Sequence, residues 1–102
     1  MAIQNTLVTT IASNVYVSSG NSAITAVYLC NYGASATSFN VWACPAGNLA
    51  TTTTQIYYNV TVQSGDTYVI DNEKMILSNG DMIKANATAN TSITTTVSYI
   101  GI

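Results

Sequence analysis

Residues 22–44, SAITAVYLCNYGASATSFNVWAC, hold the only Trp, the only Phe and both cysteines of this 102-residue chain. Two apolar runs, each about nine residues long and rich in β-branched or aromatic side chains, flank a break at residues 31–35. The Asn, Gly and Ser of that break (NYGAS) favour a turn. The stretch therefore predicts a β-hairpin at the centre of the fold, with its first strand covered on both faces.

In the predicted hairpin the two cysteines are too far apart for a disulfide. Cys30 faces Thr37 across the expected ladder, and Cys44 lies about seven residues further along, on the order of 20 Å away. A disulfide needs Cα atoms within about 7 Å of each other. We therefore expect two buried, unbridged thiols. A metal or redox site is not expected, because the chain has no His and no C-x-x-C motif to complete one.

The composition is unusual for a soluble domain. Only 6% of the residues are charged, against about 25% in ordinary soluble domains, and sixteen Thr and ten Ser fill the polar positions instead. A mean hydropathy of +0.29 argues against disorder. Such a low charge also argues against an independent monomer. We expect one domain over residues 1–102 that is covered by neighbours and forms a homo-oligomer.

Several partners are disfavoured by the same composition. The net charge is -2, and Lys74 and Lys84 are the only basic residues, so neither a nucleic acid nor an anionic membrane surface is an expected partner. The first residues, MAIQN, show no signal peptide, and no apolar run reaches the length of a membrane helix. We expect a chain made in a cytosol that stays soluble or joins an assembly.

The remaining sequence consists of short strand-like segments separated by turns. Residues 56–62 alternate most cleanly, with Ile56, Tyr58 and Val60 expected to point inward. Asn79-Gly80 predicts a tight hairpin between residues 74–77 (KMIL) and 82–85 (MIKA). The whole pattern predicts an all-β fold, a single antiparallel β-sandwich of about eight strands, immunoglobulin-like in topology. The cysteine pair around a Trp that marks immunoglobulin domains is absent, so the likeness concerns topology alone.

The sequence offers little chemistry. The acidic residues are either solvated turn residues or ligands of a calcium ion: Asp66, Asp71, Glu73 and Asp81. No His is present to act as a base near neutral pH, no Arg to clamp an anion, and no motif surrounds a nucleophilic Ser or Cys. We therefore expect no enzymatic activity, no cofactor and no metal.

Seven tyrosines are the remaining feature. By alternation, three are expected in the core: Tyr28, Tyr58 and Tyr99. The other four are expected on the surface, where Tyr favours protein or sugar contacts: Tyr16, Tyr32, Tyr57 and Tyr68. A protein interface and a carbohydrate surface both remain open at this point.

Three blocks of sequence resemble a family. Residues 16–33 (YVSSGNSAITAVYLCNYG), 65–87 (GDTYVIDNEKMILSNGDMIKANA) and 97–102 (VSYIGI) are similar to small β-rich virion structural proteins of tailed phages, especially those of cyanobacteria. The resemblance spans nearly the whole chain. It implies a virion protein that is assembled in the host cytoplasm and contacts other virion proteins, such as the major capsid protein or tail and neck proteins.

We expect a capsid decoration or cement protein that acts through protein–protein contacts. A tail, neck, baseplate or fibre component is the alternative. One version of it binds a host-surface glycan and would use Tyr32, Trp42 and Tyr57. The expected partner contacts are apolar or aromatic residues near the termini and in two internal strands or loops: Ile3, Leu7, Val8, Tyr32, Tyr57, Tyr99, Ile100 and Ile102.

Overall fold

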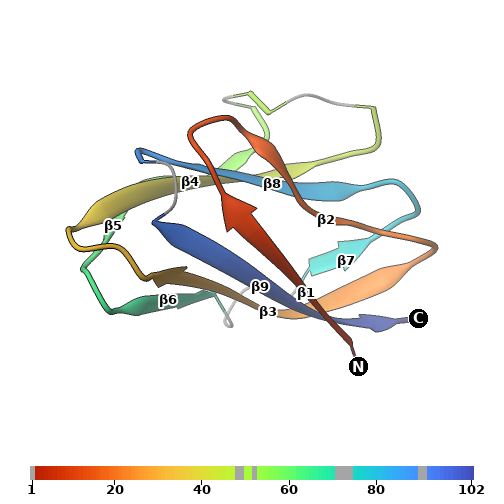
Figure 1. Ribbon diagram of the computed structural model, residues 1–102. Helices are drawn as coiled ribbons and strands as arrows, with labels where there is room; N and C mark the ends of the chain where they lie inside the picture. The colour runs from red at the N-terminus through yellow and green to blue at the C-terminus, as the bar shows by residue number, and fades with distance from the viewer. Residues whose placement is uncertain (1, 48–49, 52, 71–74, 90–91) are drawn as a thin grey trace.

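The computed structural model describes residues 2–47, 50–51, 53–70, 75–89 and 92–102, all of which form strands, turns and loops (Figure 1). The described strands are β1 (Ala2–Val8), β2 (Ser13–Val17), β3 (Ser22–Asn31), β4 (Thr37–Cys44), β5 (Gln55–Val62), β6 (Thr67–Ile70), β7 (Met75–Leu77), β8 (Met82–Ala87) and β9 (Ile93–Gly101). They build two antiparallel sheets that pack face to face. The predicted all-β sandwich is confirmed, with nine described strands where about eight were expected.

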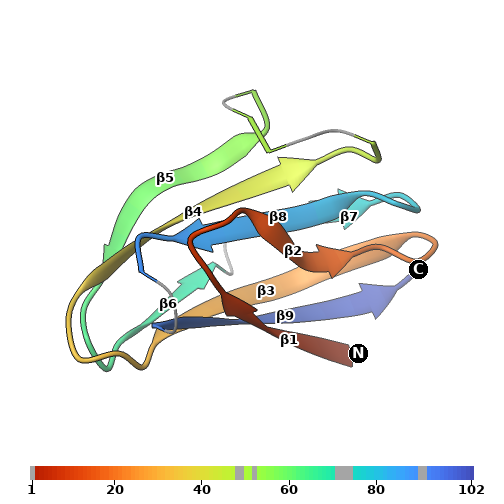
Figure 2. The same ribbon diagram turned by 45° about the horizontal axis from the view of Figure 1, so that its top comes forward.

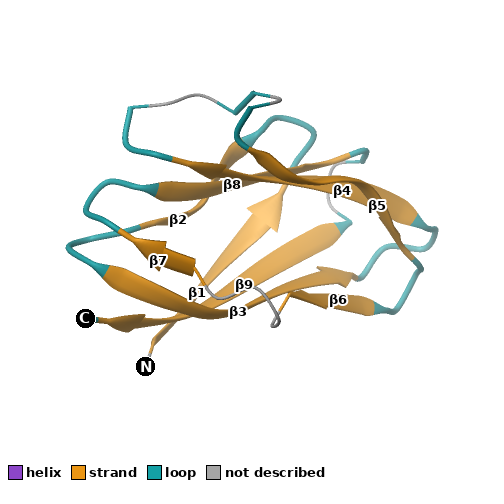
Figure 3. Cartoon of the chain, turned by 180° about the vertical axis from the view of Figure 1, so that it is seen from behind, coloured by secondary structure: helices purple, strands orange, loops and turns teal. Residues whose placement is uncertain are grey.

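Each layer of the sandwich is one sheet (Figure 2). Sheet A has the order β1-β9-β3-β6, and β7 also pairs with β3. Sheet B has the order β2-β8-β4-β5. Seen from behind, β7 and β6 lie along opposite ends of β3 (Figure 3), because β7 pairs with the start of β3 and β6 with its end. The two short strands therefore act as one interrupted edge of sheet A.

The order of the strands is that of a jelly roll. The chain changes sheet at most connections, and β4 and β5 are the only consecutive described strands that pair with each other. With β6 and β7 counted as one strand, the two four-stranded sheets follow the double Greek-key order of jelly rolls. In an immunoglobulin sandwich, by contrast, the first two strands pair within one sheet. The immunoglobulin-like topology expected from the sequence is therefore replaced by a jelly roll.

The hairpin predicted within residues 22–44 is wrong. β3 lies in sheet A between β9 and the β6/β7 edge, whereas β4 lies in sheet B between β8 and β5. The backbone of each run is thus already paired on both sides by other strands. A central position in its own sheet also explains why each run is so rich in apolar side chains. The turn residues between them make a crossover from one sheet to the other.

One buried side chain holds this crossover. Asn31 ends β3, and its Nδ2 donates to the carbonyl oxygens of Ser35 and Val62, both at 2.9 Å. Its Oδ1 accepts from the backbone N of Gly33 at 2.9 Å. The buried amide thus makes three hydrogen bonds to backbone groups. It is satisfied without water, so the crossover can lie over the end of the core.

The second predicted hairpin, between residues 74–77 and 82–85, is also wrong. β7 pairs with β3 in sheet A and β8 pairs with β2 and β4 in sheet B, while Lys74 lies outside the described residues. The Asn-Gly turn exists, since Asp81 N donates to Ser78 O at 3.0 Å and Gly80 has φ +89. Asn79 is not left-handed and instead uses its Oδ1 to accept from Gly20 N at 2.8 Å. This turn too crosses between sheets.

The core fills the space between the inner faces of the two sheets. Its fully buried apolar side chains come from six of the described strands and include Val8, Val15, Ile24, Val27, Leu29, Phe39, Val41, Ile83, Ile93 and Val97. Opposed residues on antiparallel strands point to the same side of the sheet. Alternation along β3, β8 and β9 therefore places these side chains together on the inner faces.

Alternation fails in β5, where the sequence pattern looks cleanest. The β4–β5 register shifts between Phe39 and Val41 and again between Val41 and Trp42, and each shift inserts an extra residue in β5. Asn59 takes φ +52 at the first bulge, and its backbone N donates to Asn40 Oδ1 at 2.8 Å. As a result Tyr58 is 76% exposed, not buried as expected.

Other tyrosines also change sides. Tyr16 is buried and packs against Tyr99 with ring centroids 4.5 Å apart and ring planes tilted by 42°, while Tyr68 packs against Phe39 with centroids 5.5 Å apart. Tyr28, expected in the core, lies on the exposed side of sheet A. The predicted surface positions of Tyr16 and Tyr68 and the predicted core positions of Tyr28 and Tyr58 are therefore wrong.

The cysteines are free, as predicted, although for a different reason. They lie in different sheets, Cys30 on β3 and Cys44 at the end of β4. Cys44 is buried, whereas Cys30 is half-buried on the exposed side of sheet A.

Candidate docking surface

The outer face of sheet A presents large apolar side chains to solvent. It is named here the sheet A face and is defined by Ile3, Leu7, Tyr28, Val69, Ile76 and Ile100. Four strands, each about 4.8 Å wide, and seven residues of about 3.3 Å give the whole outer side of the sheet, polar positions included, an area on the order of 450 Å². Exposed apolar side chains that gather on one face of a monomer often mark an interaction site.

The strand register explains why these side chains gather. One row across the sheet consists of Asn5, Thr96, Tyr28 and Val69, from β1, β9, β3 and β6. A second row consists of Ile100, Ala23 and Ile76, from β9, β3 and β7. Directly opposed residues point to the same side of a sheet, so Tyr28 lies beside Val69, and only small Ala23 separates Ile100 from Ile76.

The sheet A face carries no charge in the part of the chain that the structure describes. None of the five strands of sheet A contains Asp, Glu, Lys or Arg. Of the described charged residues, Asp66 and Asp81 lie in turns and Lys84 lies on β8 of sheet B. Thr, Ser and Asn fill the positions between the apolar side chains. The centres of protein interfaces have this composition, apolar and aromatic with few charges.

The structure divides the residues expected to contact partners. Ile3, Leu7 and Ile100 come together on the sheet A face, and exposed Ile102 follows the last strand. Val8 is fully buried in the core, so its prediction as a surface contact is wrong. Tyr57 and Tyr99 are partly buried and pack against the core. Tyr32 is exposed in the crossover after β3, apart from the others.

Three residues of the face were missed by sequence reasoning: Tyr28, Val69 and Ile76. Each lies in a segment that is either short or apolar on both faces. In such a segment the alternation of side chains does not show which side faces the core. The signal that would have placed them is cross-strand pairing, since Val69 opposes Tyr28 and Ile76 opposes Ala23.

The aromatic residues proposed for sugar binding do not form a platform. Trp42 is only 9% exposed on sheet B, and Tyr57 packs against the core with its ring 6.0 Å from that of Tyr68. Tyr32 lies at the end of sheet A. A sugar stacks on an accessible aromatic face, and these three residues offer no shared one.

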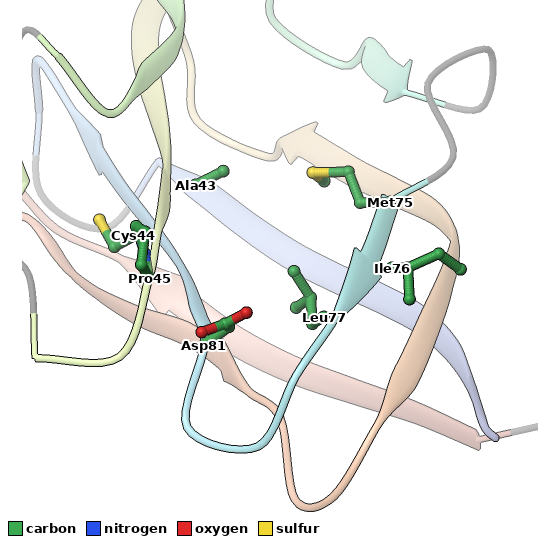
Figure 4. Close-up of a pocket in the computed structure, with 7 residues that line it drawn as sticks. All are labelled: Ala43, Cys44, Pro45, Met75, Ile76, Leu77 and Asp81. Atoms are coloured by element: carbon green, nitrogen blue, oxygen red, sulfur yellow. The ribbon is translucent and has the colours of Figure 1, made fainter.

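Two pockets open along the side of the sandwich where β7 faces sheet B. The first, of about 270 Å³, is lined by Ala43, Cys44, Pro45, Met75, Ile76, Leu77 and Asp81 (Figure 4). Among its described lining residues only Asp81 carries a carboxylate, which already accepts hydrogen bonds from Ala46 N and Ser78 N, both at 3.0 Å. The second, of about 460 Å³, is lined by Ile56, Tyr57, Ile70 and Met75. The described lining of neither pocket pairs a nucleophile with a base.

The two acidic residues that the structure describes, Asp66 and Asp81, lie far apart. Asp66 lies in the turn before β6, beside the end of β3, where its carbonyl accepts from Asn31 N. Asp81 lies in the turn before β8, near the start of β3, where its carbonyl accepts from Ser18 N. The ten residues of β3 separate them by roughly 30 Å. Asp71 and Glu73 lie outside the described residues, and the described residues contain no group of three or more metal-ligating side chains. A calcium site built from all four is therefore ruled out by distance.

Comparison with known proteins adds no relative. No protein-family model matches the chain, and neither the curated proteins nor the solved structures contain a match. Within the described residues there is no helix with the length and hydropathy needed to cross a membrane. The functional conclusion therefore rests on the sequence, the fold and the sheet A face.

Proposed function

We propose that this chain is a non-enzymatic structural protein of a tailed-phage particle, docked on the capsid as a decoration or cement protein. The sheet A face is the observation that carries the proposal. Large apolar side chains gathered on a face that carries no charge among the described residues are costly to leave in water, and a partner typically covers such a surface.

Two further observations support this function. The three blocks of sequence described above resemble small virion proteins of tailed phages. The jelly roll recurs in viral capsid domains, although lectins and cupins share it, so the fold contributes by analogy alone. Partners of this kind are other virion proteins, and the protein would join the particle in the host cytoplasm without contacting nucleic acid or membrane.

A tail, neck, baseplate or fibre position is the second candidate. A glycan-binding version of it finds less support, because Trp42 is buried and does not share an accessible surface with Tyr32 and Tyr57. A protein-binding tail component would use the same sheet A face as a cement protein. The two positions differ in how often the chain occurs in each particle.

The copy number in purified particles tests the proposal. Quantitative mass spectrometry would compare peptides of this chain with peptides of the major capsid protein. A copy number comparable to that of the capsid protein supports the cement role. A number matching the low symmetry of a neck or tail would instead favour the second candidate, and absence from the particle would overturn both.

A further inference from the structure

The backbone of β1 leaves one set of hydrogen-bonding groups unpaired along the edge of sheet A. The hydrogen bonds of β3 show which residues direct their backbone N–H and C=O groups to which neighbouring strand. Asn31 N donates to Asp66 O, and Asn31 O accepts from Gly65 N, both at 2.9 Å. The backbone of Asn31 is thus turned toward the β6 side. Backbone direction alternates along a strand, so that of Cys30 and Tyr28 is turned toward β9.

The same alternation continues across β9 to β1. Thr94 and Thr96 oppose Cys30 and Tyr28, so their backbone groups bond to β3, and those of Thr95 and Val97 bond to β1. Thr6 and Gln4 are the partners of Thr95 and Val97. The N–H and C=O groups of the intervening residues Ile3, Asn5 and Leu7 therefore point away from the sheet.

The other described edges are protected, whereas β1 is not. β2 is five residues long with a bulge between Asn14 and Tyr16, and β5 has two bulges. β6 and β7 have four and three residues. β1 pairs with β9 over seven residues without a register shift, and it contains neither a proline nor a charge. A straight, uncharged edge of this kind is a template for another strand.

We propose that β1 pairs with β1 of a second copy, antiparallel, about a two-fold axis through Asn5. Ile3 then opposes Leu7 of the second copy, Asn5 opposes Asn5, and Leu7 opposes Ile3. These are the residues whose backbone groups point outward, so each opposed pair exchanges two hydrogen bonds. Sheet A of one copy continues into sheet A of the other.

The side chains of β1 are self-complementary in this register. Ile3 and Leu7 lie on the exposed side and meet as two aliphatic pairs, which favour cross-strand packing. Asn5 Oδ1 accepts from Thr96 Oγ1 at 2.8 Å, which leaves Asn5 Nδ2 to donate across the axis. The strand has no charge that a symmetric copy would repel. A second copy is therefore the occupant that fits this edge.

The contact is small, and this sets its strength. Seven residues at about 3.3 Å form a contact roughly 23 Å long and one strand wide, so it buries less area than a standard protein interface. We expect a concentration-dependent dimer in solution that is reinforced when copies are held side by side on a particle. Pairing would also join two sheet A faces into one surface. Self-association does not depend on the proposed virion role, and its test uses the purified chain alone.

The mass in solution tests the proposal. Sedimentation between about 10 μM and 1 mM should show the mass rising from 10.7 kDa toward twice that value. Asn5→Asp keeps the size of the side chain and an acceptor for Thr96 but places two carboxylates opposite each other. It should raise the dimer dissociation constant by about tenfold or more. The matched control Asn14→Asp adds the same charge to exposed Asn14 on the edge of sheet B and should change nothing.

A monomer throughout this range, or an Asn5→Asp variant that dimerises like the unmodified chain, would overturn the proposal. A chain that stays monomeric but loses its place in particles on Asn5→Asp substitution would overturn it too, since the edge would then receive a strand from a different protein.

Cysteine substitutions test the register. In a Cys30→Ser background, which removes the half-exposed thiol, Asn5→Cys should form a disulfide-linked dimer, because opposed Cα atoms lie about 5.5 Å apart. Ile3→Cys should crosslink to Leu7→Cys in a mixture but not to itself. Efficient crosslinking of Ile3→Cys to itself would indicate parallel strands and contradict the two-fold arrangement.

Discussion

The Nδ2 of Asn31, at the end of β3, donates to the carbonyl oxygen of Val62, at the end of β5, across 2.9 Å. One fully buried amide thereby joins sheet A to sheet B. It also fixes the crossover through Ser35 and Gly33. The edge of the core at this end depends on a polar side chain, since no apolar residue could satisfy these three backbone groups.

Removal of this amide should therefore cost much of the stability. Asn31→Ala leaves two carbonyls and one N–H without their partner, and we expect the free energy of unfolding to fall by about 3 kcal/mol. Urea denaturation followed by circular dichroism measures this loss. The exposed control Asn14→Ala should change the same quantity by less than about 0.5 kcal/mol. Equal effects of the two variants would contradict the bridging role of Asn31.

Thr95 offers the opposite test. Its Oγ1 is buried between the sheets and has no hydrogen-bond partner among the described residues. Thr95→Val replaces this hydroxyl by a methyl group of similar size, so the folded state no longer holds an unsatisfied polar atom. We expect the free energy of unfolding to rise by about 1 kcal/mol, again by urea denaturation. A destabilised Thr95→Val variant would show that the hydroxyl does have a partner.

Asn59 tests the bulge that reverses the side-chain order of β5. Its φ of +52 is accessible to Gly and to Asn but strained for most other residues. Asn59→Ala should lower the free energy of unfolding by about 1 kcal/mol, whereas Asn59→Gly should stay within about 0.5 kcal/mol of the unmodified chain. The pair is compared by thermal and urea denaturation. Indistinguishable variants would contradict a left-handed residue at this position.

Gly33 tests the close approach that the crossover makes to the start of β9. A Cβ built on Gly33 would lie 2.9 Å from Ser92 Oγ and 3.2 Å from Asn31 Oδ1. Gly33→Ala should therefore destabilise the fold by about 1–3 kcal/mol. Gly65→Ala provides a contrast, because its Cβ would meet nothing within 4 Å and only the φ of +82 is unfavourable. An unaffected Gly33→Ala variant would contradict the close packing at this crossover.

The strands were largely predictable from the sequence, but their partners were not. Gly, Asn and Ser at residues 31–35 and Asn79-Gly80 do mark chain reversals. A reversal signal is local, however, and it does not say whether the chain returns in the same sheet or in the opposite one. The choice depends on which strands cover each run, and those strands come from distant parts of the sequence. Both predicted hairpins were wrong for this reason.

Half of the residues that define the sheet A face were predicted from the sequence. Ile3, Leu7 and Ile100 were expected as contacts and lie on one face, because the terminal segments are apolar and form adjacent strands. Tyr28 was wrongly expected in the core. The run that contains it is apolar on both faces, so the sequence does not show which side chains of the run point inward. The bulge at Asn59 exchanged Tyr57 and Tyr58, and no periodicity in the segment announces such a bulge.

The central claim is that the sheet A face docks on the particle, and binding to particles that lack this chain tests it most directly. Ile76 is 67% exposed on that face, and Tyr58 is 76% exposed on sheet B, so each accepts a lysine without disturbing the core. We predict that Ile76→Lys lowers the occupancy at a limiting concentration about tenfold or more, while Tyr58→Lys binds like the unmodified chain. Full binding of Ile76→Lys together with loss of binding by Tyr58→Lys would contradict the claim and place the docking surface on sheet B.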